Sequence, residues 1–309
     1  MVTVGVPQAL LYYYYFPFWK SFLEACRAQV ILSPPTSKRI LERGLELAES
    51  DVCLPVKVFL GHVESLISRV DYVLVPRVVK PERRGYSCPK LLGLPDMVRS
   101  LLPPSLSLLS PLQDEDRRKE TRKDWFEVGK KLGELSSWRL QKAYWKALLA
   151  QRKAEKEKRR SNYQSRKELR IGLVGHSYIL NDSYVSHFLS KKLKERGVEV
   201  FLSEEVKTWQ IREALKGLPK PLFWSFEKEL VGSALFWVKN KLVDGLILVN
   251  SFGCGPDSLS QVLLETEVAK HEETPLLNLV FDEHTSEAGF LTRLEAFLDM
   301  LAWRKLNAG

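Results

Sequence analysis

The stretch Ile171-Gly172-Leu173 is a short apolar segment that precedes a helical pattern and then a second apolar segment, Val200-Phe201-Leu202-Ser203. The N-terminal part of the chain begins in the same way, with Val4-Gly5-Val6 before a helical pattern and then Val30-Ile31-Leu32-Ser33. Short apolar runs that alternate with helical periodicity indicate strand–helix–strand units with parallel strands. The two halves of the chain are therefore expected to share one architecture.

The same alternation extends outward from both stretches. Strands are expected at residues 2–6, 29–32 and 72–75, and then at 170–174, 198–202, 245–250 and 276–281. Helices are expected at residues 16–28, 37–48, 56–68 and 91–101, and then at 184–196, 204–215, 226–241, 258–271 and 287–302. This order predicts an α/β protein of two Rossmann-like, doubly wound lobes with largely parallel sheets.

A basic segment separates the two lobes. The 309-residue chain has a net charge of +9, and residues 114–170 contain 19 Lys and Arg against 10 Asp and Glu, so this segment holds the whole surplus. Its apolar residues recur at helical spacing, which predicts a helical connector that ends at Arg159 and Arg160. The favoured interpretation is a solvated connector of mixed charge, and the alternative is a docking surface for an acidic partner or an anionic ligand. The predicted domains are residues 1–113, the connector 114–169, and residues 170–309.

The composition argues against several classes of protein. An apolar content of 45%, with eight Trp and 14 Phe, supports packed cores and excludes wholesale disorder. Four cysteines are too few for a disulfide scaffold. The N-terminus lacks the pattern of a signal peptide, and no apolar run reaches the roughly 18 residues of a membrane span. We therefore expect a cytoplasmic protein without a membrane or nucleic-acid partner, since the basic surplus is confined to one segment.

Three of the four cysteines share a local pattern. Cys53, Cys88 and Cys254 are each followed by proline, directly or after one residue, and then by an apolar helical run. Proline is favoured in the first turn of a helix, so the three thiols are expected at helix N-termini. Backbone N–H groups and the helix dipole favour a thiolate there. Cys26 lies within an amphipathic helix and is expected to be a buried hydrophobic side chain.

Three such thiolates predict a soft-metal site, and the candidates are zinc, a reactive cysteine and an iron–sulfur cluster. Structural zinc usually binds close C-x-x-C pairs, which this sequence lacks. A nucleophilic cysteine would need no similar neighbours. An iron–sulfur cluster can bind widely separated thiolates, and three of them would leave one iron with a non-cysteine ligand. The cluster is one hypothesis, and ordinary structural cysteines are the other.

Two glycines flank Cys254 between a predicted strand and a predicted helix. Gly253 and Gly255 would allow a phosphate to bind at the start of the helix. They would equally allow the backbone to pack closely against a cluster. Both residues are therefore candidates for cofactor binding.

Further titratable residues follow predicted strands. His176 follows the first strand of the second lobe, and Glu283, His284 and Glu287 follow the last strand. Side chains beyond the carboxyl ends of strands face the usual ligand site, which in a two-lobed protein is the cleft between the lobes. These four residues are the candidate catalytic groups or the non-cysteine iron ligand. The alternative is that the loop 282–287 only caps the last helix.

Several motifs together resemble one known family. They are Cys53-Leu-Pro-Val-Lys57, Cys88-Pro-Lys-Leu-Leu-Gly-Leu-Pro-Asp96, Ser251-Phe-Gly-Cys-Gly-Pro-Asp257 and Asp282-Glu-His-Thr-Ser-Glu-Ala-Gly289. They resemble the uncharacterised domain attached to CoA-enzyme activases (the DUF2229 type), which is akin to 2-hydroxyacyl-CoA dehydratase subunits and double-cubane-cluster proteins. The resemblance implies a [4Fe–4S] or larger iron–sulfur cluster bound by Cys53, Cys88 and Cys254. A complete double cubane would need about six thiolates, more than this chain contains.

The resemblance also implies a function and partners. It implies low-potential electrons from an ATP-hydrolysing activase of the actin/sugar-kinase superfamily. The substrate would be an acyl-CoA or another small molecule, and the chain a dehydratase (lyase) or reductase component. The alternative is a non-catalytic cluster-bearing subunit or electron-transfer module that docks an activase. The sequence has no G-x-x-x-x-G-K-[ST] loop, so ATP is expected to bind only the partner. A second copy of the chain or a related cluster subunit is a further expected partner.

Overall fold

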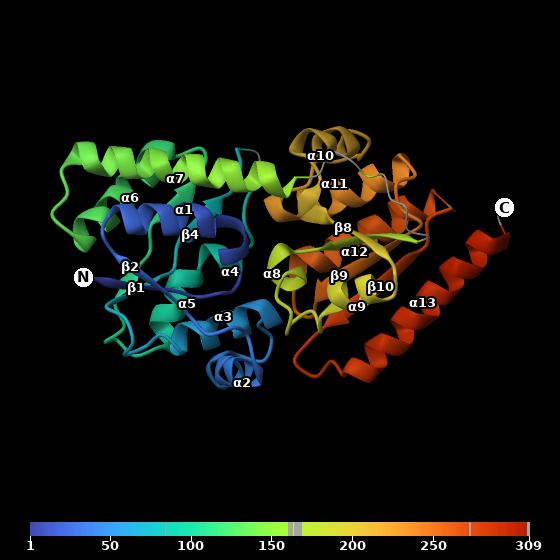
Figure 1. Cartoon of the computed structure of the whole chain (residues 1–309), viewed down its shortest axis with the longest axis horizontal. Helices are drawn as coiled ribbons and strands as arrows, with labels where there is room; N and C mark the ends of the chain where they lie inside the picture. Colours follow the sequence, from blue (N-terminus) through green and yellow to red (C-terminus); the bar gives the residue numbers. More distant parts are fainter. Residues whose placement is uncertain (84, 160–162, 164–168, 272, 308–309) are drawn as a thin grey trace. The chain divides into compact units, whose positions relative to one another are not determined.

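The chain folds into two compact units (Figure 1). The computed structural model describes residues 1–83, 85–159, 163, 169–271 and 273–307. Unit 1 consists of Met1–Glu157 and Phe223–Ser225, and unit 2 consists of Lys158–Leu222 and Phe226–Gly309. The chain therefore passes between the units three times.

Unit 1 contains a four-stranded parallel sheet with the strand order β2-β1-β3-β5. Its strands are β1 (Thr3–Val6), β2 (Gln29–Leu32), β3 (Tyr72–Leu74) and β5 (Leu108–Leu109). A separate two-stranded parallel sheet pairs β4 (Arg77–Lys80) with β6 (Leu112–Asp114). The sequence did not predict β4, β5 or β6, because each is too short to show a clear alternation of apolar and polar residues.

The basic segment contributes to unit 1 as two helices. The helices up to its end are α1 (Tyr12–Ala25), α2 (Lys38–Leu47), α3 (Leu54–Glu64), α4 (Pro89–Leu92), α5 (Leu94–Leu101), α6 (Arg118–Leu132) and α7 (Ser137–Lys158). Phe18 and Phe22 of α1 contact Trp125 of α6 edge to face, with ring centroids 4.9 and 5.1 Å apart. Residues 118–132 and 137–158 of the predicted connector are helical, and their apolar residues complete a core.

A side chain of α7 compensates for a proline within α1. Pro17 lacks an N–H group and disturbs the hydrogen bonding of the helix around it. Gln151 donates from Nε2 to the Tyr14 carbonyl (2.8 Å) and accepts at Oε1 from the Phe18 N–H (3.3 Å). One amide side chain thus satisfies a carbonyl and an N–H on either side of Pro17.

Unit 2 repeats the strand order of unit 1. Its strands are β7 (Arg170–Gly175), β8 (Glu199–Leu202), β9 (Gly245–Ser251) and β10 (Leu276–Phe281), all parallel, in the order β8-β7-β9-β10. In both four-stranded sheets the first strand along the chain lies between the second and the third, and the fourth is at the edge. The prediction of two α/β lobes with parallel sheets is confirmed.

The helices of unit 2 pack around a core that includes Phe201, Trp237, Leu246 and Leu248. They are α8 (Ser177–Leu180), α9 (Leu189–Glu195), α10 (Thr208–Leu215), α11 (Ser225–Lys239), α12 (Gly255–Ala269) and α13 (Glu287–Asn307), with a short 3-10 helix at Ser203–Glu205. The helix expected at residues 184–196 begins only at Leu189. The reason is that the two preceding residues have left-handed φ values of 49° and 57°, which interrupt a right-handed helix.

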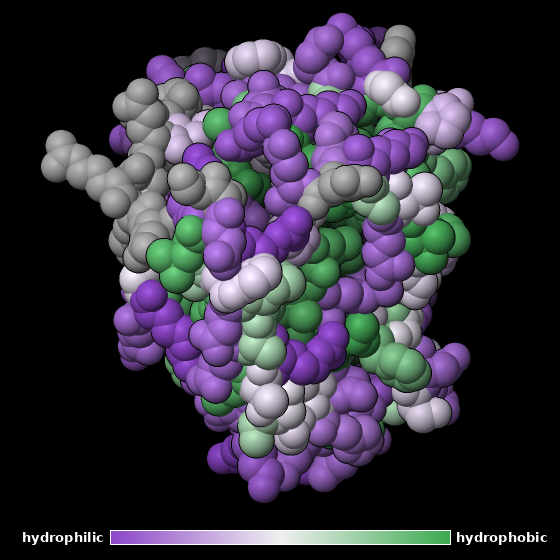
Figure 2. Space-filling view, turned by 90° about the vertical axis from the view of Figure 1, so that its right-hand side faces the viewer, coloured by the Kyte–Doolittle hydropathy of each residue, from purple (hydrophilic) through white to green (hydrophobic). Residues whose placement is uncertain are grey.

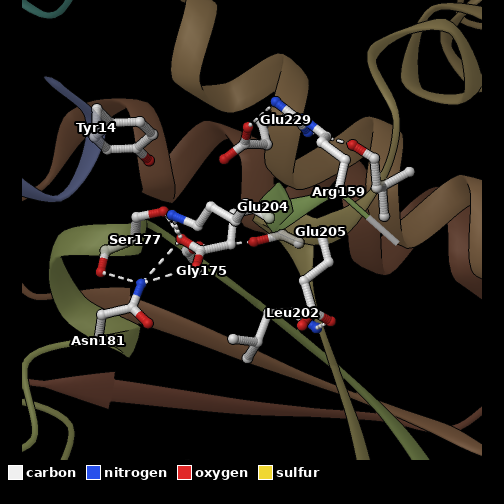
Figure 3. A network of polar contacts seen from close by, with 12 residues as sticks. Tyr14, Arg159, Gly175, Ser177, Asn181, Leu202, Glu204, Glu205 and Glu229 are labelled. Atoms are coloured by element: carbon white, nitrogen blue, oxygen red, sulfur yellow. Dashed lines mark hydrogen bonds and ion pairs between the residues drawn. The ribbon is translucent and has the colours of Figure 1, made fainter. Parts of the chain in front are cut away.

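Lys158, the last residue of α7, and Arg159, which follows it, belong to unit 2. Figure 3 shows Arg159 beside Glu229. Arg159 Nη2 lies 3.2 Å from Glu229 Oε2, and Lys158 Nζ lies 2.7 Å from Glu204 Oε2. Burial raises the pKa of Glu229, and Arg159 opposes that rise. Arg159 therefore differs from the solvated face expected from the sequence, because it pairs with a buried carboxylate. Arg160 lies outside the described residues.

The surface carries dispersed apolar side chains. The face shown in Figure 2 is largely hydrophilic, with hydrophobic residues gathered near its middle. Exposed apolar residues of unit 2 include Trp209, Phe252, Leu259 and Val262. Among the helices within the described ranges, none combines the length and the apolar character needed to cross a membrane.

Candidate metal centre

The strand order of unit 2 brings two loops together at one edge of its sheet. The chain continues from β7 to β8 on one side and later to β9 on the other, so the carboxyl ends of β7 and β9 are neighbours. Ligands of open α/β sheets usually bind at such a switch point. His176 directly follows β7, and Cys254 is the N-cap of α12 after β9.

Three buried side chains and the half-buried Cys254 converge at this switch point. His176 Nε2 lies 2.9 Å from Asp257 Oδ1 and 3.2 Å from Glu227 Oε1. One ligand atom each from His176, Cys254 and Asp257 lie within 4.8 Å of one another. The side chains of His176, Glu227 and Asp257 are 3%, 2% and 1% exposed. The group therefore offers buried nitrogen and oxygen donors beside the sulfur of the half-buried Cys254.

Neighbouring residues hold these side chains in place. Asp257 lies in the first turn of α12, where the helix dipole favours an acid, and its Oδ2 accepts a hydrogen bond from the Ser251 N–H (3.2 Å). The Ser260 hydroxyl donates to Glu227 Oε2. The His176 ring stacks on Tyr178, with centroids 4.6 Å apart. The local fold thus fixes the orientation of the imidazole and of both carboxylates.

Burial and charge act in opposite directions on the titratable groups. Burial opposes a charge on His176, but Asp257, Cys254 and Glu227 together raise the pKa of the imidazole well above its usual value. Burial raises the pKa of the Cys254 thiol to about 12, although His176 lowers it. The thiolate expected at this helix N-terminus is therefore a thiol in the protein alone, because desolvation outweighs the helix dipole. A bound metal ion would displace that proton.

The other two predicted metal-ligand cysteines lie in unit 1. Cys53 and Cys88 are the N-caps of α3 and α4, and each helix has proline in its first turn. Lys90 Nζ, in the first turn of α4, lies 3.3 Å from the Asp51 carbonyl, two residues before Cys53, so the two helix starts are side by side. The prediction that Cys53, Cys88 and Cys254 occupy helix N-termini is confirmed.

Cys26 has a different environment from these three. It is the C-cap of α1 and is fully buried, and burial raises the pKa of its thiol to about 12. The prediction of a buried hydrophobic side chain is confirmed.

The described part of the chain contains no group of cysteines typical of a [4Fe–4S] site. The metal-ligand group found within those residues is His176, Cys254 and Asp257, with a single cysteine. Cys53 and Cys88 belong to unit 1, and Cys254 belongs to unit 2.

The acid–base residues expected after the last strand come from the loop next to the one that carries Cys254, and their catalytic role stays a prediction. Glu283, His284 and Glu287 follow β10, an edge strand that β9 separates from β7. Glu287 pairs with Lys192 (2.7 Å), and Ser286 Oγ accepts a hydrogen bond from a backbone N–H in the first turn of α13 (3.3 Å). This loop caps α13, and its residues follow the edge strand rather than the switch-point strands.

The two candidate glycines differ in what the backbone requires. Gly253 has a φ of 74°, a left-handed conformation that favours glycine. A Cβ atom added to Gly255 would meet no heavy atom within 4 Å. The turn between β9 and α12 therefore needs glycine at 253 but not at 255, and cofactor binding by either residue stays a prediction.

Sequence reasoning missed Asp257 and Glu227. Asp257 carried a usable signal, because it lies in the first turn of the helix that Cys254 caps, on a loop after a buried strand. Glu227 carried none, since α11 brings it to the switch point from a part of the chain without a motif.

Comparisons with known proteins identify one family. The model of the CoA enzyme activase uncharacterised domain (DUF2229) matches residues 3–206, a range that contains Cys53, Cys88 and His176 but not Cys254. No curated protein matches the chain. Among solved structures, a LacI family transcriptional regulator from Arthrobacter sp. FB24 in complex with lactose is similar at 12% identity and a TM-score of 0.21, over 91% of this chain and 97% of that chain.

Proposed function

Because the chain belongs to the family of CoA enzyme activase uncharacterised domains (DUF2229), we propose that it is an iron–sulfur subunit that works with an ATP-hydrolysing activase. The activase, of the actin/sugar-kinase superfamily, would supply low-potential electrons. The chain would act on an acyl-CoA or another small substrate, as a dehydratase or reductase component. The observation that carries this proposal is the shared setting of Cys53, Cys88 and Cys254, each the N-cap of a helix with proline in its first turn.

The three cysteines have the chemical properties needed to bind a negatively charged iron–sulfur cluster. Their thiolates would bind iron, and the N–H groups of the first helical turns would stabilise negative charge on sulfur. Cys53 is almost fully buried, which would limit access of water and oxygen to a cluster. When bound, the cluster would supply low-potential electrons and an iron that lacks a cysteine ligand. His176, next to Cys254, is the described group best placed to bind that iron or to orient the thiolate.

ATP hydrolysis is assigned to the partner. The sequence contains no phosphate-binding loop of the Walker type, and its glycine-flanked Cys254 turn is the nearest alternative. In this proposal the chain accepts electrons from the activase, and the activase hydrolyses the ATP that drives their transfer.

A non-catalytic electron-transfer module is the second candidate function. It is favoured by the position of Glu283 and His284, in the loop between the edge strand and α13, and of Glu287, the first residue of α13. If those three residues take no part in acid–base chemistry, His176, directly after β7, is the remaining predicted catalytic residue.

Iron and acid-labile sulfide in protein purified without oxygen test the cluster. We expect Cys53→Ser, Cys88→Ser and Cys254→Ser each to lower iron and sulfide and to bleach the broad visible absorption. Cys26→Ala is the matched control, because its thiol is buried at the end of α1 and a small apolar residue replaces it without a new polar group. Equal iron loss in all four variants, or in none, contradicts the proposal.

Turnover separates the two candidate functions. The protein would be mixed with the activase, ATP and a reductant, and candidate acyl-CoA substrates would be followed for dehydration or reduction. Product formation that Glu283→Gln and His284→Ala abolish supports the catalytic function. Cluster reduction without product supports the electron-transfer module.

A further inference from the structure

The buried group at the switch point of unit 2 has the composition of a site for one metal ion. We propose that His176, Cys254 and Asp257 bind a single divalent transition-metal ion, such as Zn²⁺ or Fe²⁺, through an imidazole nitrogen, the thiolate and a carboxylate oxygen. Mixed nitrogen, sulfur and oxygen donors suit these borderline metals rather than Mg²⁺ or Ca²⁺.

The distances fit such an ion. Metal–ligand bonds of about 2.0–2.3 Å place the donor atoms of a tetrahedral site about 3.3–3.8 Å apart. The donor atoms of His176, Cys254 and Asp257 lie within 4.8 Å of one another. Small side-chain rotations would close the remaining distance, and the three residues come from two loops that the sheet already holds side by side.

The hydrogen bonding of the group is incomplete in the protein alone. His176 Nε2 can carry one proton, yet Asp257 Oδ1 and Glu227 Oε1 both lie within 3.2 Å of it. His176 Nδ1 is buried and has no hydrogen-bond partner among the described residues. Within the same residues, neither Glu227 nor Asp257 forms an ion pair with a lysine or arginine. A protonated His176 supplies one positive charge to two buried carboxylates and leaves Nδ1 without a partner, so the group has room for a further cation.

Glu227 has the position of a supporting carboxylate. The Ser260 hydroxyl holds its Oε2, while its Oε1 faces the imidazole. Glu227 Oε1 lies at the same imidazole nitrogen as Asp257 Oδ1, so it holds the ring in place from beside the proposed ligand set. Glu227 is therefore a positioning residue of the proposed site.

The single-ion site does not depend on the iron–sulfur proposal. Both occupants use the Cys254 thiolate, so a cluster bound through Cys254 and a single ion are alternatives on one chain. The cluster and the single ion differ in the ligand residues that each requires besides Cys254. A cluster requires Cys53 and Cys88, whereas the single ion requires His176 and Asp257.

Titration of the metal-free, reduced full-length chain with Co²⁺ tests the site. We expect one Co²⁺ per chain to bind with a near-ultraviolet thiolate-to-cobalt absorption band. Cys254→Ser should abolish the band, and His176→Gln and Asp257→Asn should each weaken Co²⁺ binding by at least about tenfold. Cys53→Ser and Cys88→Ser are the matched controls and should keep both the band and the stoichiometry.

Three results would overturn the proposal: no saturable Co²⁺ binding, a band that survives Cys254→Ser, or a band that Cys53→Ser removes equally well. Thermal unfolding of each variant identifies a failure to fold. Asp257→Asn preserves the shape of the side chain and keeps the test decisive if His176→Gln does not fold. Absence of sulfide in anaerobic protein would reject the cluster and leave this cobalt experiment unaffected.

Discussion

At the scale of single residues, His62 connects protonation to stability in unit 1. Its Nδ1 lies 2.8 Å from Ser33 Oγ and its Nε2 lies 2.9 Å from Thr36 Oγ1, and burial lowers the pKa of the ring to about 4. The unfolded chain takes up this proton near pH 6.5, so the stability from a neutral His62 is complete above about pH 6.5. It is lost as the pH falls toward 4, by about 2 kcal/mol between pH 6.5 and 5.

Urea unfolding at pH 7, 6 and 5 measures this contribution. His62→Gln should lower stability at pH 7 and flatten the loss between pH 7 and 5. The exposed histidine provides the control, since His284→Gln should keep the slope of the wild type. Parallel pH profiles for wild type and His62→Gln would rule out the buried imidazole as the cause.

A second residue-scale prediction concerns the ion pair between Arg159 and Glu229. Arg159→Leu leaves a buried carboxylate without its cation and should cost about 2–4 kcal/mol. Lys153→Leu, on the helix α7 that ends just before Arg159, removes an exposed pair with Glu157 and should change stability by less than about 1 kcal/mol. Adding Glu229→Gln to Arg159→Leu should recover part of the loss in thermal unfolding, and equal melting of both single variants would contradict this account.

At the scale of helices and strands, α2 and α3 pack through glycines. A Cβ atom on Gly61 would overlap the Ile40 carbonyl oxygen, and one on Gly44 would overlap the Lys57 carbonyl oxygen. Gly61→Ala should therefore force the helices apart and lower stability by about 1–3 kcal/mol. Gly255→Ala at the start of α12 is the control, because the added methyl group meets open space. Circular dichroism melting distinguishes the two, and a harmless Gly61→Ala would mean that the helix pair tolerates a wider spacing.

The contact between α7 and the proline of α1 gives a second prediction at this scale. Gln151→Leu leaves the Tyr14 carbonyl and the Phe18 N–H without their shared partner and should cost about 1–3 kcal/mol. Gln141→Leu, on the same helix, should cost less in the same chemical denaturation experiment. If both variants unfold at the same denaturant concentration, the Gln151 side chain does not contribute to stability through these two hydrogen bonds.

The sequence predicted where helices and strands begin better than it predicted which strands lie next to one another. Proline after Cys53, Cys88 and Cys254 predicted three helix starts, because the rule depends only on local backbone geometry. The acid–base role given to Glu283 and His284 assumed that the last strand borders the ligand site. β10 is the edge strand and pairs with β9, so strand order alone leaves that role a prediction. Periodicity reports which face of a strand is buried and carries no information on which strands pair.

At the scale of the whole molecule, the chain returns briefly from unit 2 to unit 1 at Phe223–Ser225. This return completes unit 1. Tyr86 and Phe223 stack with ring centroids 5.0 Å apart, the Tyr86 N–H donates to the Phe223 carbonyl (3.1 Å), and the Ser225 N–H donates to the Tyr86 carbonyl (2.9 Å). Two α/β lobes could be predicted from the sequence because each half contains its own strands. This return could not, because three residues without periodicity give no signal of where they pack.

The return should protect the loop that contains Cys88. Phe223→Ala removes the ring that covers Tyr86, two residues before Cys88, and should increase the rate of Cys88 alkylation several-fold, measured by mass spectrometry. Trp209→Ala, at an exposed aromatic residue of unit 2, is the control and should leave that rate unchanged. An unchanged rate in Phe223→Ala would show that the stacking does not limit access to the thiol.

The late position of Phe223–Ser225 has a consequence for synthesis. Residues up to 157 leave the ribosome first, and translation at about 5–20 residues per second then needs roughly 3–14 seconds to reach residue 225. During that interval the segment around Tyr86 lacks the strand-like partner it has in the finished chain. We expect a metal-delivery factor or an oxidant to reach the Cys88 loop more easily during that interval than in the finished chain.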